Sequence, residues 1–239
     1  MIKRLIPEII KAPFRSYLHS RRVYRSQAGQ DFWVFGEVSN EKHGGFFLDI
    51  GAYDGVELSN TYVLEKKYNW NGICVEANPE SFEMLKRHRR AICVNACLDD
   101  EEGFVSFSKR GFLGGIVSSD TDNKSVECES EVLTVKTVTL VNLLKELKSP
   151  TEIDYLSIDI EGAEERVLGK FPFNEYKFKC MTIERPTDSL KAVLKDNGYI
   201  LIKEIPGLDC FYVHQDFMDQ YRANVFSFYS KKWLMICIG

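Results

Sequence analysis

The stretch Asp49-Ile50-Gly51-Ala52-Tyr53-Asp54-Gly55 decides the expected fold, because it ends an apolar run and leads into a helix-like segment. Gly51 and Gly55 have no Cβ, so the backbone can turn tightly there and approach a ligand. Asp49 suits a cationic group such as the ammonium of an amino acid. The spacing differs from the GxGxxG of a pyrophosphate-binding turn, and the sequence contains no GxxxxGK[ST] P-loop.

The next two apolar runs end in residue types that suit an adenosine ligand. They finish as Cys74-Val75-Glu76-Ala77-Asn78-Pro79 and as Asn95-Ala96-Cys97. Glu76 follows the glycine turn by about 25 residues, near the position where doubly wound folds place an acid on the ribose hydroxyls. A small residue such as Ala96 leaves room for a flat adenine ring. The three strand ends together favour adenosine with a cationic tail.

Apolar runs and helix-like segments alternate from residue 46 onward, which predicts a doubly wound α/β fold with a mostly parallel sheet. The expected strands are Phe46–Ile50, Ile73–Glu76, Ile92–Ala96, Tyr155–Asp159, Met181–Glu184 and Tyr199–Ile205, with final strands at Phe211–His214 and Trp233–Ile238. The expected helices are Glu57–Lys67, Pro79–His88, Leu140–Leu147, Ala163–Leu168 and Ser189–Asn197. A β-rich insertion near 103–138, with a mobile loop near Ser118–Ser125, interrupts the single domain expected over 26–239.

Composition indicates a globular protein of the cytoplasm. The 239 residues are 44% hydrophobic and 28% charged, and no apolar run reaches the length needed to cross a bilayer. The net charge of −4 argues against a nucleic-acid partner. Seven cysteines without a CxxC spacing are expected to be reduced thiols. Four of them lie in apolar runs: Cys74, Cys93, Cys180 and Cys237.

Residues 1–25 form a basic extension in which cations alternate with apolar side chains. Its cations are Lys3, Arg4, Lys11, Arg15, Arg21, Arg22 and Arg25, and Glu8 is its one acid. One interpretation is an amphipathic helix that packs on the body or on a second subunit in a homodimer. The other is contact with an anionic membrane surface or an acidic acceptor.

The sequence resembles the FkbM-type methyltransferases from Ser26 to about Gly198. The resemblance is carried by Ser26-Gln27-Ala28-Gly29-Gln30-Asp31, Phe47–Gly55, Ser59-Asn60-Thr61 with Leu64-Glu65, Trp70–Glu76 and Tyr155–Glu164. It implies a Rossmann-like, S-adenosylmethionine-dependent methyltransferase that acts on hydroxyls of glycans or natural products. The expected cofactor set is Gln27, Gln30, Asp31, Asp49, Gly51, Ala52, Tyr53, Asp54, Gly55, Ser59, Asn60, Glu76, Ala77, Asn78, Ala96, Cys97 and Asp159.

The fourth strand end, Asp159-Ile160-Glu161-Gly162, supplies the candidate catalytic residues together with Glu184 at the next strand end. Adjacent strands lie about 5 Å apart, so Asp159 and Glu184 can converge. One carboxylate can act as general base for an acceptor hydroxyl. Alternatively, Asp159 and Glu184 hold a divalent cation such as Mg²⁺. In the third interpretation, Asp159 caps the following helix and Glu184 pairs with Arg185.

Other polar residues are weaker candidates. His214 ends a predicted strand and can act as a base because histidine titrates near neutrality. His43 precedes the first strand, on the side away from the strand carboxyl ends, and is expected in a surface loop. Gln27, Gln30 and Asp31 stand before the apolar run 32–35, which indicates either a lid over the ligand or an N-cap at Ser26 with polar surface beyond.

The expected reaction is a direct, in-line displacement in which Asp159 or Glu161 takes the proton of the acceptor hydroxyl. The protein then mainly supplies positioning and proton removal. An NAD-type oxidoreductase on the same sheet is a rival, although GxGxxG is missing and Asp49 would repel a pyrophosphate. A catalytically silent binding protein that keeps the fold is the second rival.

Overall fold

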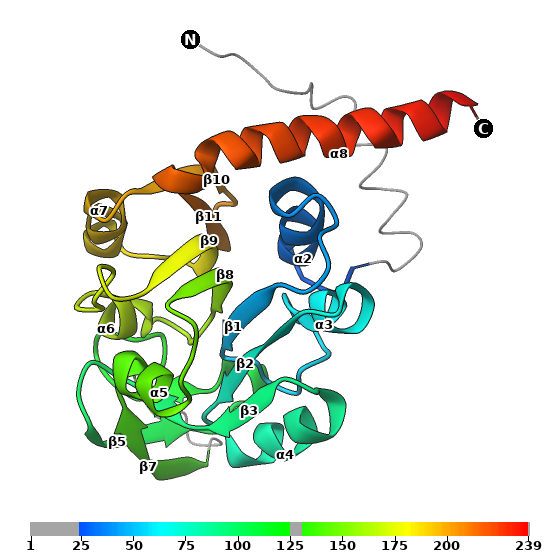
Figure 1. Cartoon of the computed structure of the whole chain (residues 1–239). Coiled ribbons are helices and arrows are strands. Elements are labelled where there is room, and N and C mark those ends of the chain that lie inside the picture. Colours follow the sequence, from blue (N-terminus) through cyan, green and yellow to red (C-terminus); the bar gives the residue numbers. More distant parts are fainter. Residues whose placement is uncertain (1–23, 125–130, 239) are drawn as a thin grey trace.

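The computed structural model describes residues 24–124 and 131–238, with side chains through residue 231. Its centre is a seven-stranded sheet in the order β10-β11-β9-β8-β1-β2-β3 (Figure 1). The strands are β1 (Phe46–Ile50), β2 (Asn71–Glu76), β3 (Ile92–Asn95), β8 (Glu152–Ile158), β9 (Lys177–Glu184), β10 (Tyr199–Glu204) and β11 (Asp209–His214). The strands from β3 to β9 are parallel, whereas β11 is antiparallel to both of its neighbours. This is a doubly wound, Rossmann-like order, so the predicted fold class is confirmed.

The central strands are apolar on both faces because helices cover both. Phe47, Leu48 and Ile50 of β1 are at most 1% exposed, and the facing residues of β8 are equally buried. Asp49 and Ser157 interrupt this apolar pattern and pair in register near the carboxyl ends of β1 and β8. A polar pair inside a buried sheet marks the place where the core opens toward a site.

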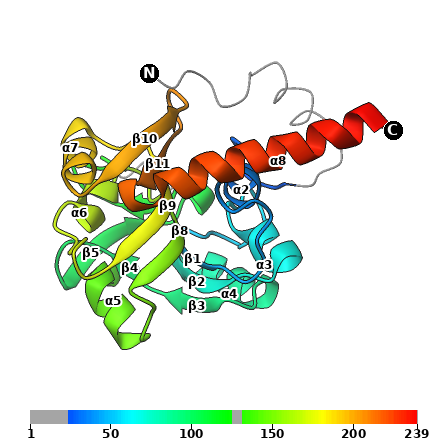
Figure 2. The same cartoon turned by 45° about the horizontal axis from the view of Figure 1, so that its top comes forward.

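The helices lie in two layers, one on each side of the sheet (Figure 2). On one side lie α5 (Leu140–Glu146), α6 (Glu164–Leu168) and α7 (Asp188–Asp196). On the other lie α2 (Gln30–Phe32) with the π-helix Trp33–Val38, α3 (Tyr62–Tyr68), α4 (Pro79–His88) and α8 (Met218–Ile238). Pro79 begins α4 as expected, and the Asn78 side chain caps it by accepting a hydrogen bond from the Glu80 N–H.

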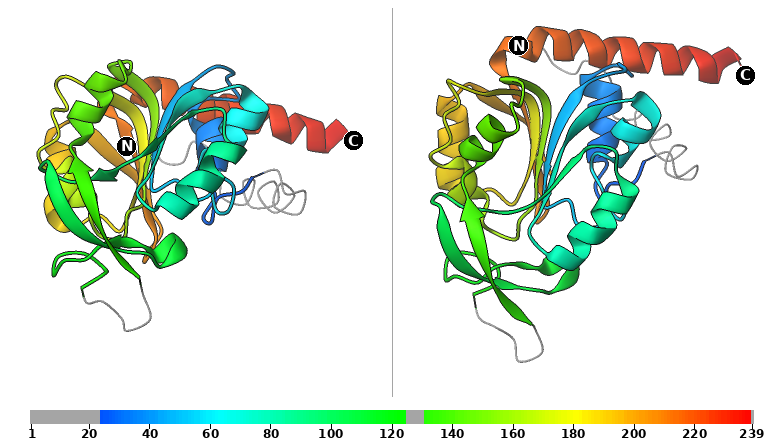
Figure 3. Two further views of the ribbon diagram at one scale, coloured as in Figure 1. Left: turned by 90° about the horizontal axis from the view of Figure 1, so that it is seen from below. Right: turned by 60° about the horizontal axis from the view of Figure 1, so that its bottom comes forward.

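The predicted β-rich insertion forms a second sheet of four strands, which lies beside the β3 end of the main sheet (Figure 3). Its order is β4 (Cys97–Leu98), β7 (Val132–Val138), β5 (Gly103–Ser108) and β6 (Gly115–Ile116). The short helix Gly111–Leu113 connects β5 to β6. Within residues 118–124, Thr121 and Asn123 are buried, and the Asp122 N–H donates to the Glu161 carbonyl. Ser125 lies outside the described residues.

The predicted strand Trp233–Ile238 is wrong, since this segment belongs to α8. Tyr221, Val225, Phe228 and Tyr229 have helical spacing and are buried. These side chains pack α8 against the body, and the helix continues from them through the C-terminal apolar run. Within the described residues no helix is both long and apolar enough to cross a membrane. Of the predicted basic extension 1–25, residues 1–23 lie outside the described part of the chain.

The thiols follow the prediction where the structure describes them. Cys74 and Cys180 are buried, and Cys93 is half-buried; all three are free. Cys97 and Cys210 are also free and buried. The Cys237 side chain is outside the described set.

Candidate active site

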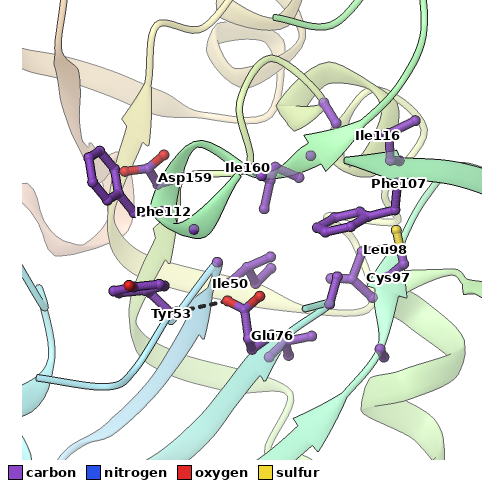
Figure 4. A pocket seen from close by; sticks show the side chains of 18 residues that line it. Ile50, Tyr53, Glu76, Cys97, Leu98, Phe107, Phe112, Ile116, Asp159 and Ile160 are labelled. Carbon is purple, nitrogen blue, oxygen red and sulfur yellow. Dashed lines mark hydrogen bonds between the residues drawn. The ribbon is translucent and has the colours of Figure 1, made fainter. Parts of the chain in front are cut away.

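Two adjoining cavities open at the carboxyl edge of the parallel strands. The inner pocket is lined by Glu76, Ala77, Ala96, Cys97 and Phe107 among others, and the second sheet closes one side of it (Figure 4). The outer cleft is lined by Gln27, Gln30, Asp49, Ala52, Ser59, Asn60, Glu161 and Glu184 among others. Gly51, Tyr53, Phe112 and Asp159 line both cavities. The predicted strand-end residues therefore come together, as parallel topology requires.

Gly51 stands where the two cavities meet. Its φ of +81° lies in the left-handed region, and a Cβ added there would lie 1.8 Å from the Asp159 carbonyl oxygen. Its N–H donates to the Val75 carbonyl at 3.0 Å. The backbone after β1 is therefore fixed between β2 and β8, with room only for glycine.

Glu76 at the end of β2 is held by backbone donors. The Tyr53 N–H donates to Glu76 Oε2 at 2.8 Å (dashed in Figure 4), and the Asn78 N–H donates to Oε1 at 2.7 Å. Burial raises the pKa of Glu76 to about 7, although these two bonds favour the ionised form. Each carboxylate oxygen can accept a second hydrogen bond. Glu76 is therefore oriented to receive hydroxyl donors from a ligand in the inner pocket.

Asp49 belongs to a buried network behind the outer cleft. Thr61 Oγ1 donates to Asp49 Oδ2 at 2.5 Å, and Arg89 Nη1 lies 3.8 Å from the same oxygen. Arg89 also bonds Glu65 through Nε at 3.0 Å. Burial raises the pKa of Asp49, and the positive charge of Arg89 opposes that rise. Asp49 thus lines the outer cleft, and the positive charge of the buried Arg89 offsets part of its negative charge.

Asp159, Glu161 and Glu184 form an acidic cluster on the other side of Gly51. One carboxylate oxygen of each residue lies within 4.8 Å of the others. The pKa of Asp159 is raised well above its usual range, first because the cleft walls displace water around it and then because it faces Glu184. Its side chain still reaches solvent through the cleft. Burial and the charge of Glu184 raise the pKa of Glu161 to about 7.

Arg185 contacts this cluster, although it does not line the cleft. Its Nη2 donates to Glu184 at 3.0 Å, to Glu161 at 3.2 Å and to Asp122 at 2.5 Å. The predicted pairing of Glu184 with Arg185 is therefore present. The predicted capping by Asp159 is not: the α6 N-cap, Ala163, has no side-chain bond.

The segment 24–32 contributes two residues to the lining of the outer cleft. Gln27 and Gln30 line it, and Gln30 Nε2 donates to Asp209 Oδ2 at 2.9 Å. Asp31 points into the protein, where its carboxylate accepts from the Arg25 and Phe32 N–H groups and from Ser26 Oγ. Gln27 and Gln30 line the cleft, as the first interpretation expects, whereas the N-cap at Ser26 is wrong: the N-cap of α2 is Gly29 without a side-chain bond, and Gln30 and Asp31 are buried. Asp31 therefore leaves the set of residues that can contact a ligand.

His214 is not a candidate base, which corrects the sequence prediction. Because β11 runs antiparallel to β9, its first residue lies at the carboxyl edge and its last residue at the opposite edge. His214 pairs with Tyr199 there, and its Nδ1 accepts from the Asp216 N–H at 3.2 Å. The reversal instead brings Asp209 opposite Glu184. Asp209, whose pKa burial raises to about 6, was missed because strand direction is not visible in the sequence.

Some predicted cofactor residues support the loops and line neither cavity. Asp54 Oδ1 accepts from the Val56 and Glu57 N–H groups, Asn78 caps α4, and Gly55 packs against Leu85 and Arg89. Ser59 and Asn60 do line the outer cleft, and Asn60 Nδ2 donates to Ser157 Oγ at 3.0 Å. His43 contacts the Tyr68 ring away from both cavities.

Backbone strain gathers around the outer cleft. Tyr53, Leu58 and Glu161 line it with positive φ values of 49°, 53° and 56°. The adjacent Arg185 has a φ of 37°. Non-glycine residues rarely adopt this region, and such residues cluster at functional sites. Four of the eight described non-glycine residues with positive φ therefore lie at or next to the outer cleft.

A family comparison now identifies the chain. The model of the Methyltransferase FkbM domain matches residues 49–201, which is more than half of the 239 residues. The chain belongs to the FkbM methyltransferase family. The match begins at Asp49 and includes Glu76, Asp159 and Glu184, so the FkbM domain contains the strand ends that build both cavities. A comparison with curated proteins found no match.

Solved methyltransferase structures resemble this FkbM domain at low identity. Methyltransferase FkbM from Methylobacillus flagellatus KT is 15% identical with a TM-score of 0.47, over 72% of this chain and 44% of that one. Precorrin-6y C5,15-methyltransferase from Geobacter metallireducens GS-15 is 12% identical with a TM-score of 0.44, over 81% and 90% of the two chains. M. jannaschii TYW2 in complex with AdoMet is 16% identical with a TM-score of 0.38, over 82% and 80%.

Proposed function

We propose that the FkbM domain binds S-adenosylmethionine across the two cavities and methylates a hydroxyl of a glycan or natural product. The observation that carries the proposal is the position of Glu76 and Asp159 on opposite sides of Gly51, in cavities that join there. A ligand with a ribose at Glu76 and its reactive centre near Asp159 must pass over Gly51. The missing Cβ leaves that path open.

The inner pocket fits an adenosine group. Ala77 and Ala96 leave space at the ends of β2 and β3, while Phe107 and Ile116 supply apolar surface from the second sheet. A flat aromatic base gains most from such surfaces. Glu76 accepts the ribose hydroxyls, because its two oxygens are fixed by backbone N–H groups and keep free lone pairs.

The outer cleft fits the cationic remainder of the cofactor and the acceptor. Bound S-adenosylmethionine supplies an activated methyl group. Asp49 attracts the ammonium group of the cofactor. Thr61 and Arg89 hold the Asp49 carboxylate in place. Asp159 or Glu161 accepts the proton of the acceptor hydroxyl. A base whose pKa is raised by burial and by neighbouring carboxylates takes up that proton more readily.

The test is formation of S-adenosylhomocysteine from S-adenosylmethionine by the purified chain, with and without a panel of glycosides and polyols. We expect product only when an acceptor is present, and no loss of rate in EDTA. A rate that requires added Mg²⁺ replaces the general-base role with a metal held by Asp159 and Glu184. Tight cofactor binding without turnover on any acceptor supports the silent binding protein, and tight NAD binding supports the oxidoreductase.

A further inference from the structure

Large apolar side chains are exposed around the outer cleft. Ten such residues are exposed among the described ones, and three of them, Leu58, Phe112 and Leu113, line this cleft. Their exposed fractions are 47%, 59% and 41%. We call these three residues the apolar rim. Exposed apolar groups gathered at one cavity indicate a surface that a ligand covers.

Backbone strain at Leu58 and contacts of Phe112 and Leu113 define the position of the rim. Leu58 has a φ of +53°, which is unfavourable for a bulky side chain. Phe112 and Leu113 lie in the short helix Gly111–Leu113, and the buried Asn123 donates from Nδ2 to the Leu113 carbonyl at 3.3 Å. The Phe112 ring also contacts the Tyr53 ring edge-on, with centroids 6.3 Å apart. These contacts fix the rim before any ligand binds.

The charge of the outer cleft restricts what the rim can hold. Within the described part of the chain, the lining contains the carboxylates Asp49, Glu57, Asp159, Glu161 and Glu184, and no lysine, arginine or histidine. Arg185 stands outside the lining and already contacts three carboxylates. Arg110, two residues before Phe112, is also outside the lining. An anionic group beside the acceptor hydroxyl would face several like charges in a cleft of reduced dielectric constant.

We propose that the apolar rim is the platform for the acceptor, and that the acceptor is an uncharged sugar ring without phosphate near the methylated hydroxyl. This inference rests on the proposed methyltransferase function. The C–H face of the ring packs on Phe112, Leu58 and Leu113, and its hydroxyls face the carboxylates. Nucleotide-activated sugars and phosphate-linked glycans are rejected because their phosphates would meet the carboxylates rather than a cation.

Leu113 gives the cleanest variant, because it lines the outer cleft and not the inner pocket. Leu201 on β10 is its matched control, with 44% exposure and no part in either cavity. We expect Leu113→Asn to raise the acceptor KM about tenfold, with kcat and the Kd of S-adenosylhomocysteine within threefold of wild type. Leu201→Asn is expected to leave all three unchanged. Equal acceptor KM values for the two variants overturn the platform.

The charge requirement is tested with matched pairs of methyl hexosides and methyl hexoside 6-phosphates. We expect kcat/KM to be at least tenfold lower for each phosphate at constant ionic strength. Equal or better use of the phosphates overturns the inference while leaving the methyltransferase function intact. Failure of the wild-type chain to bind S-adenosylhomocysteine overturns the proposed function, and the inference with it. Binding without methylation of either member of any pair overturns the inference alone.

Discussion

The carboxylates on the two halves of the carboxyl edge of the sheet have different hydrogen-bond and charge partners. On the β1–β2 half, Asp49 is bonded to Thr61 and faces Arg89, and Glu76 accepts two backbone N–H groups. On the β8–β9 half, Asp159, Glu161 and Glu184 face one another. Arg185 contacts the last two of these three.

This difference separates binding from chemistry. A carboxylate already bonded to fixed donors keeps one orientation and can receive a ligand without rearrangement. Carboxylates that repel one another hold a proton more tightly, so one of them can take up the proton of a substrate hydroxyl. We therefore propose that the β1–β2 half binds the cofactor and that the β8–β9 half removes the proton.

The largest expected effect comes from Asp159→Asn, which removes a base without changing the shape of the side chain. We expect the methyl transfer rate to fall by about 10²–10⁴-fold, the contribution of a positioned general base. The Kd of S-adenosylhomocysteine should change by less than about threefold, because ligand binding depends on the other half. Asp196→Asn on the exposed face of α7 is the control. An unchanged rate in Asp159→Asn would remove the residue from the mechanism.

Gly51→Ala tests the junction of the two halves. The added Cβ meets the Asp159 carbonyl oxygen at 1.8 Å, in a backbone conformation with φ +81°. Strain and overpacking together should lower the free energy of unfolding by about 2–5 kcal/mol. Gly207→Ala is a matched control, because Gly207 has φ +76° with no atom within 4 Å of the added Cβ. It should cost only about 1–2 kcal/mol. Equal losses in chemical denaturation would mean that the junction is not tightly packed.

Glu76→Gln tests the binding half. The amide nitrogen that replaces one carboxylate oxygen is a donor, so the glutamine side chain can accept from only one of the Tyr53 and Asn78 N–H groups. We expect calorimetry to show S-adenosylhomocysteine binding weakened about 10–100-fold, the effect of losing hydrogen bonds to a charged group. Asp154→Asn is the control, because Asp154 accepts from the Phe46 N–H at the opposite edge of the sheet. Comparable weakening in both variants would indicate a general structural effect rather than a ribose contact.

The smallest effect concerns pH. Glu76, Glu161 and Glu164 have pKa values of about 7 in the folded chain, whereas the ordinary value is 4.5. Between these values the folded state holds more protons than the unfolded state, so stability falls as pH rises. Without ligand, the Tm should therefore decrease by a few degrees from pH 6.5 to 7.5. Glu161→Gln should reduce this slope. A Tm that increases over the interval contradicts the raised pKa values.

The sequence predicted best those features that follow from parallel strands. Asp49, Glu76, Asp159 and Glu184 end consecutive parallel strands, so their convergence requires only the alternation of strand and helix. Asp209 and His214 could not be assigned, since the direction of β11 depends on how the last strand enters the sheet. The prediction of a strand at Trp233–Ile238 failed because a short apolar run does not distinguish strand from helix. The helical spacing of Tyr221, Val225 and Phe228, which precede this run, is what identifies it as part of a helix.

The insertion residues that line the two cavities were not predicted, Phe107 and Ile116 in the inner pocket among them. Phe112 and Leu113 come from the insertion, whose placement over the strand ends is a tertiary feature with no local signal. The inward orientation of Asp31 likewise depends on the backbone N–H groups of residues 25, 26 and 32, which surround its carboxylate.

The most direct measurement is calorimetric titration of S-adenosylmethionine and S-adenosylhomocysteine into the purified wild-type chain, with NAD as the comparison ligand. We expect one site per chain with micromolar affinity for both adenosyl ligands and no binding of NAD. Absence of binding by both adenosyl ligands, in a chain shown to be folded, would contradict the assignment of the inner pocket and of Glu76.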